Sequence, residues 1–150
     1  MPPASGLRSC YAKVGRLVYF GRMLDKIRLH ATGRLPSDYH GNLGIGFDGR
    51  TCSFLKVNYA DLVARVQQGG TDEEILAWCH ERGGGRSDDE CNIWSRFMMK
   101  TGWRDDRSAI LRQRIVEYGL DGKNLTIETF FDLNDYDEGR DPVAAQSWNA

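Results

Sequence analysis

The stretch VGRLVYFGRMLDKIRLHAT, from Val14 to Thr32, decides how this chain folds. At 100° per residue it predicts one helix with an apolar stripe, and Val18 and Leu29 add apolar side chains on the opposite side. Gly33 and Pro36 follow as signals that end the helix. A helix that is apolar on two sides is expected at the centre of the fold, where its charged residues must be paired. The stripe consists of Leu17, Phe20, Met23, Leu24, Ile27 and Ala31.

Helix-capping patterns recur along the rest of the chain. Three pairs have the spacing of N-terminal caps: Asn58 with Asp61, Thr71 with Glu74, and Ser87 with Glu90. A further helix is expected to open at Asp105 or Asp106, and a last one to run from about Thr126 to Tyr136. Alternating strand patterns are nearly absent, so the sequence predicts an all-α, compact array of about six helices. We expect residues 1–150 to form a single helical domain with flexible ends, at about 1–6 and 142–150.

The segment from Leu35 to Arg50 is rich in turn-forming residues. We therefore predict a glycine-rich loop after the first long helix. A short hairpin within this loop is an alternative that the sequence does not decide. Gly44, Gly46 and Gly49 match the spacing of a dinucleotide-binding loop. That motif needs a buried strand before it, whereas turn residues precede it here, so we interpret the match as chance. His40 is the histidine whose setting in a loop most invites a function.

Composition excludes several classes of protein. The 150 residues suit one domain, and 41% hydrophobic with 27% charged residues is ordinary globular usage. A net charge of −1 gives no field for holding a polyanion, so no nucleic-acid partner is expected. The chain has no long apolar run and no signal-like start, which predicts a cytoplasmic protein without a membrane partner.

The cysteines and histidines do not predict a metal or cofactor site. Cys10, Cys52, Cys79 and Cys91 are scattered without a CxxC pair, so we expect reduced thiols that serve as small core residues. His80 adjoins Cys79, but neighbouring residues on a helix point about 100° apart and no second pair would complete the ligands.

Three stretches together resemble a known family. They are RMLDKIR at Arg22–Arg28, FDLNDYDEGR at Phe131–Arg140, and GFDGR at Gly46–Arg50 with the Phe54-Leu55 that follows. In combination they resemble the bacterial family called domain of unknown function 5069, over most of the chain. The resemblance implies a small bacterial protein, and it supplies no activity and no catalytic residue.

Charge is concentrated towards the two ends of the chain. Between Arg16 and Arg34 there are five basic residues and one acid, and between Thr126 and Asp141 six acids and one basic residue. Complementary charge predicts that these segments lie together, either as a structural ion-pair network or as a mixed-charge cleft. In such a cleft an arginine fork could hold a carboxylate or phosphate, and a desolvated carboxylate could act as a base. The candidate ligand-binding residues are Arg22, Asp25, Lys26, Asp132, Asp135, Glu138 and Arg140.

The leading functional hypothesis is a small cytosolic helical protein that binds a small anionic or zwitterionic metabolite in this cleft; whether it also catalyses a reaction is left open. The alternative is a non-catalytic protein-interaction module or accessory subunit, whose partner is another protein or a second copy of the chain. A concave pocket lined by the charged residues would favour the first hypothesis. A flat, exposed apolar patch would favour the second.

Overall fold

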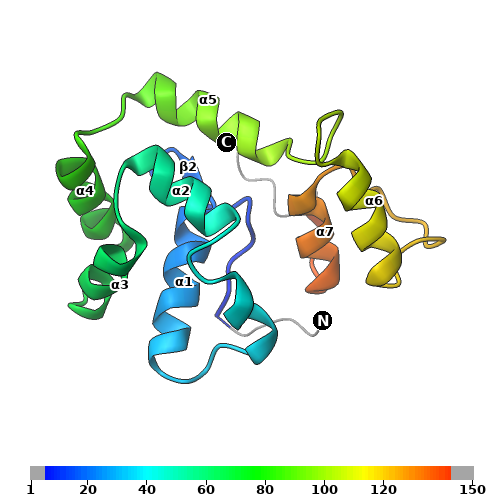
Figure 1. Cartoon of the computed structure of the whole chain (residues 1–150), viewed down its shortest axis with the longest axis horizontal. Helices are drawn as coiled ribbons and strands as arrows, with labels where there is room; N and C mark the ends of the chain where they lie inside the picture. Colours follow the sequence, from blue (N-terminus) through cyan, green and yellow to red (C-terminus); the bar gives the residue numbers. More distant parts are fainter. Residues whose placement is uncertain (1–5, 143–150) are drawn as a thin grey trace.

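The computed structural model of the chain, which describes residues 6–142, is mostly helical (Figure 1). The central helix α1 (Phe20–Ala31) is followed by α2, α3 and α4, then by α5, and finally by α6 and α7 at one end of the molecule. The remaining bounds are η1 (a 3₁₀ helix, Ser37–Asn42), α2 (Phe47–Leu55), α3 (Tyr59–Gln67), α4 (Asp72–Gly83), α5 (Asp88–Met99), α6 (Ser108–Glu117) and α7 (Phe130–Asp137). The predicted helical class holds broadly, but over the described range there are seven α-helices and one 3₁₀ helix rather than about six.

Helix α1 occupies the centre, as its two apolar sides predict. Phe20, Met23 and Leu24 are completely buried, and Leu29 on the second side is buried as well. The main core around α1 takes side chains from α2 to α5 and from α7, including Leu55, Leu62, Ile75, Met98 and Phe131. A smaller cluster of Leu111, Phe130 and Leu133 joins α6 to α7.

The start of the first helix was predicted wrongly. Residues Lys13–Val14 (β1) and Leu17–Val18 (β2) form a two-stranded antiparallel sheet, so the fold is not purely α-helical. Gly15 has a φ of 58° in the turn between the strands, and Tyr19 has a φ of 68° just before α1. Positive φ interrupts a helix, and a glycine-containing two-residue turn favours a hairpin. The hairpin buries the same apolar side chains that suggested a longer helix.

The capping signals located three helices correctly. The Asn58 side chain accepts hydrogen bonds from Ala60 and Asp61 backbone N–H groups, and the Thr71 and Ser87 capping boxes both form reciprocally. The last two helices begin later than expected. Asp105 caps a preceding turn, accepting from the Gly102 and Arg107 N–H groups, so α6 begins at Ser108. Thr129 caps α7, which begins at Phe130 rather than near Thr126.

The predicted glycine-rich loop is largely helical. Residues Ser37–Asn42 form η1, α2 begins at Phe47, and the short hairpin left open for this segment is not there. The reason is Asp48, whose buried carboxylate accepts a hydrogen bond from the Gly44 N–H at 3.0 Å and thereby closes the turn into α2. Because η1 and not a strand precedes Gly44, the dinucleotide-binding pattern lacks its structural context, as expected.

The four cysteines are buried and unpaired, as predicted. No helix within residues 6–142 combines the length and hydropathy that a membrane crossing requires. The two segments expected to be flexible lie outside the described residues, except for Gly6 and Pro142.

Candidate functional site

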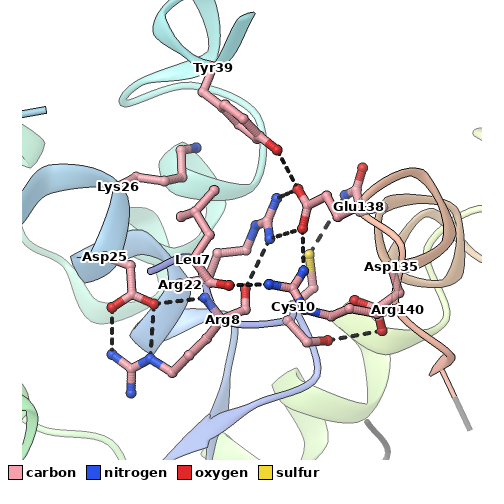
Figure 2. Close-up of polar contacts among 12 residues, drawn as sticks. Leu7, Arg8, Cys10, Arg22, Asp25, Lys26, Tyr39, Asp135, Glu138 and Arg140 are labelled. Carbon is pink, nitrogen blue, oxygen red and sulfur yellow. Dashed lines mark hydrogen bonds and ion pairs between the residues drawn. The ribbon is translucent and has the colours of Figure 1, made fainter. Parts of the chain in front are cut away.

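A buried ion pair joins the centre of α1 to the end of α7. The Arg22 guanidinium donates from Nη1 to Glu138 Oε1 at 2.8 Å and from Nη2 to Oε2 at 2.6 Å, and the two side chains are only 5% and 3% exposed (Figure 2). Tyr39 of η1 donates to Oε2 at 2.7 Å, and Arg140 also donates to the carboxylate. Arg22, near the start of the chain, therefore faces Glu138, near its finish, as the complementary charges predict.

The same residues hold the segment that precedes the hairpin. Arg22 donates to the Arg8 carbonyl at 2.9 Å, and Arg140 donates to the Leu7 carbonyl. Ser9 donates its hydroxyl to Asp135 Oδ2 at 3.0 Å. Three of the sequence-predicted residues thus share one network, Arg22, Glu138 and Arg140, while the Asp135 side chain is bonded separately to Ser9 (Figure 2). Their partners belong to the chain itself, which is the arrangement that a structural network requires.

Asp25 pairs with Arg8 and makes no contact with Glu138. Its carboxylate accepts from the Arg8 side chain at 2.9 and 3.0 Å and from the Arg8 N–H at 2.9 Å. Arg8 also bonds Asp72 of α4, which in turn pairs with Arg28 at 2.7 Å. Sequence reasoning missed Arg8 because it lies outside the two charge-rich segments that were compared.

Lys26 forms its ion pair with a residue of α2 and not with an acid near the C-terminus. Its Nζ donates to both oxygens of Asp48 at 3.1 Å, and Asp48 is completely buried. Tyr19 donates its hydroxyl to Asp48 Oδ1 at 2.6 Å. Sequence reasoning did not select Asp48, because it lies within the segment assigned as a loop.

Asp132 faces a different direction from Asp135 and Glu138. Its carboxylate accepts from the Tyr11 hydroxyl at 2.6 Å and from the Glu128 N–H at 3.0 Å. Glu128 was expected on the last helix but lies before it. The structure therefore does not bring Asp25, Lys26 or Asp132 to the Glu138 carboxylate.

The pKa values of Glu138 and Asp135 shift in opposite directions from their ordinary values. Burial opposes ionisation of Glu138, but the hydrogen bonds from Arg22 and Tyr39 outweigh it and hold the pKa of Glu138 below its ordinary value. For Asp135, burial raises the pKa to about 6, because its single side-chain hydrogen bond from Ser9 compensates only in part. Asp135 Oδ1 has no partner among the described residues.

A cavity of about 330 Å³ lies between η1 and α2 on one side and α6 and α7 on the other. Of the sequence-predicted residues, only Arg22 and Lys26 border it. Three further arginines line it, and we call it the arginine cavity after them: Arg50 of α2, Arg107 before α6, and Arg114 of α6. Among the described residues Asp38 is the one acidic side chain on its lining, and Tyr19, Phe47 and Phe130 provide aromatic surface.

The three arginines are weakly engaged by the protein. Arg50 makes no ion pair within the described range, and Arg107 lies over the Phe130 ring with its guanidinium carbon 5.5 Å from the centroid. Arg114 reaches Glu117 only at 3.6 Å, at an exposed position. Thr101, which also borders the cavity, has a buried hydroxyl with no hydrogen-bond partner in the structure's described part. Sequence reasoning did not select these arginines, because it compared charges only between Arg16 and Arg34 and between Thr126 and Asp141.

The histidine singled out in the sequence has structural contacts. His40 lies in η1, its Nε2 is 2.9 Å from the Leu35 carbonyl oxygen, and its ring meets that of His30 edge-on at 4.7 Å. Between Gly6 and Pro142, no group of three or more histidine, cysteine or acidic side chains is placed to hold a metal ion.

Comparison with known proteins gives a family without an activity. The family model described as "Domain of unknown function (DUF5069)" matches residues 4–140, and the chain belongs to that family. No curated protein matches the chain. The comparisons therefore identify no ligand and no reaction.

Glu138→Gln is expected to lower the free energy of unfolding by about 3–5 kcal/mol, because it leaves the Arg22 guanidinium buried without a counter-charge. Denaturant unfolding measures this. The matched control is Asp88→Asn, which breaks the Arg16–Asp88 pair at side chains 62% and 80% exposed and should cost less than about 1 kcal/mol. Equal effects of the two substitutions would contradict the buried pair.

Asp135→Asn is expected to change how stability depends on pH. The pKa of Asp135 is raised to about 6 in the folded state, above its unfolded value of about 3.9. The stabilisation from proton binding at Asp135 is therefore fully present below pH about 4 and is lost as pH rises through 6. Unfolding curves from pH 4 to 7.5 should show the variant gaining about 1–2 kcal/mol relative to the unmodified protein as pH rises. A constant difference across that range would contradict the buried, poorly compensated carboxyl.

Proposed function

We propose that this protein binds a small anionic metabolite in the arginine cavity. The observation that carries the proposal is the convergence of Arg50, Arg107 and Arg114 on one hollow, whose lining within residues 6–142 has a single acidic side chain. Like charges brought together repel one another, and an anion between them removes that cost. Guanidinium groups suit this role because they bind carboxylate or phosphate through two parallel hydrogen bonds.

The walls of the cavity support the proposal. Arg22 and Lys26 border it but are paired with Glu138 and Asp48, so they fix its shape and leave the ligand's charge to the other three arginines. The rings of Phe47 and Phe130 could contact an apolar part of the ligand. A volume of about 330 Å³ lies at the lower end of the range for small-molecule sites.

This is a narrower version of the mixed-charge cleft expected from the sequence. The carboxylates of Asp135 and Glu138 are engaged by Ser9, Arg22 and Tyr39, so the proposal assigns them to holding the fold and not to the ligand. It assigns no reaction. As part of the same proposal we place the protein in the cytoplasm of a bacterium, in keeping with its family resemblance and its buried, unpaired cysteines.

Arg114→Gln is expected to weaken binding of a polyanionic probe by about tenfold or more, since a hydrogen bond to a charged group contributes about 1.5–3 kcal/mol. Isothermal titration calorimetry with inorganic pyrophosphate and with citrate at low salt provides the measurement. Arg112→Gln is the matched control, because Arg112 lies on the same helix and is exposed but does not line the cavity. Absence of binding by the unmodified protein, or equal weakening by both variants, would refute the proposal.

A second candidate function is contact with another protein through α5. Ile93 and Phe97, one turn apart on that helix, are 69% and 65% exposed and so present two neighbouring large apolar side chains to solvent. If this face pairs with a second copy of the chain, sedimentation velocity should show association that rises with concentration and is lost in Phe97→Ser. A monomer at all concentrations would exclude self-association through α5.

A further inference from the structure

A second hollow lies on the other side of the first turn of α7. The arginine cavity is lined there by Phe130, Leu133 and Asn134, whereas the second hollow is lined by Glu128, Thr129 and Asp132. Its volume is about 360 Å³. We call it the mixed-charge groove and define it by Arg96, Met99, Lys100, Trp103, Glu128 and Asp132.

Opposite charges border this groove without pairing across it. Arg96 and Lys100 stand four residues apart at the end of α5, where like charges share a helix face and repel. Neither cation, nor the Glu128 side chain, makes an ion pair with any residue between Gly6 and Pro142. Cations from α5 and carboxylates from the α7 side therefore line one hollow and stay separate.

The Asp132 carboxylate is fixed in position before any ligand arrives. It is buried, and its two oxygens accept one hydrogen bond each, from the Tyr11 hydroxyl at 2.6 Å and the Glu128 N–H at 3.0 Å. Each carboxylate oxygen can accept a further bond. A carboxylate held in this way loses little freedom when it binds a cationic group.

The groove also contains apolar surface. Trp103 is 42% exposed, and the buried side chain of Met99 also lines the groove. The guanidinium carbon of Arg104 lies 4.9 Å from the centroid of the Trp103 ring, and the exposed indole offers a large, rigid apolar contact area.

We propose that the mixed-charge groove binds a free amino acid with a large apolar side chain. Asp132 and Glu128 hold its ammonium group, Arg96 and Lys100 hold its carboxylate, and its side chain lies against Trp103 and Met99. A simple anion would be repelled by the two carboxylates, and a simple cation would be repelled by the two basic groups. A zwitterion can pair with both sets of charges at once. The ligand class therefore differs from that of the arginine cavity, and neither proposal depends on the other.

Calorimetric titration with L-phenylalanine, L-tryptophan, L-methionine and L-leucine tests this. We expect binding by at least one of them, and for that amino acid the amide and the N-acetyl derivative, each lacking one charge, should bind about tenfold more weakly or worse. Absence of binding by all four, or equal binding of a single-charge derivative, would overturn the inference.

Variants locate the site. Glu128→Gln and Lys100→Gln remove exposed charges, so they should fold normally and weaken amino-acid binding about tenfold. Glu81→Gln and Lys123→Gln remove exposed charges elsewhere and should leave it unchanged. Arg114→Gln should also leave it unchanged, which separates failure here from failure of the arginine cavity. Unaltered binding in both Glu128→Gln and Lys100→Gln would overturn the assignment to this groove.

Discussion

A buried guanidinium in the middle of the central helix is the constraint on which the rest of the structure depends. Arg22 lies on α1 with its side chain almost wholly withdrawn from solvent, and such a charge is tolerable only beside a carboxylate. Glu138 supplies that carboxylate from the end of α7. The chain must therefore return to its own beginning, and the segment from Leu7 to Cys10 is held between the two helices as they meet.

The second buried cation of α1, Lys26, also requires a carboxylate from another part of the chain. Lys26, one turn after Arg22, brings in Asp48 and so positions α2, while Arg22 positions α7. The arginine cavity is bordered by both of these elements, and Arg22 and Lys26 form part of its wall. The first turn of α7 in turn separates this cavity from the mixed-charge groove. Two buried pairs on one helix thus determine where both candidate sites lie.

The sequence predicted features that depend on neighbours a few residues apart. The caps at Asn58, Thr71 and Ser87 are of this kind, because the donor and acceptor are separated by a single helical turn. Sequence reasoning failed where one pattern fits two structures. The apolar residues from Val14 to Val18 suit a buried hairpin as well as a helix, and the positive φ angles of Gly15 and Tyr19 exclude the helix. Pairing of charges is harder still. Complementary charge correctly predicted that the two ends of the chain meet. It did not predict that Asp25 pairs with Arg8 or that Lys26 pairs with Asp48, because these pairs depend on the packing of distant elements.

The most direct test of this account is a double-mutant cycle on the central pair, with Arg22→Met, Glu138→Gln and the combined variant compared by denaturant unfolding. If the pair holds α7 against α1, the combined variant should be more stable than the sum of the single effects predicts, with a coupling energy of about 2–3 kcal/mol. Single effects that add to within about 0.5 kcal/mol would show that the two side chains do not depend on each other, and would contradict the account.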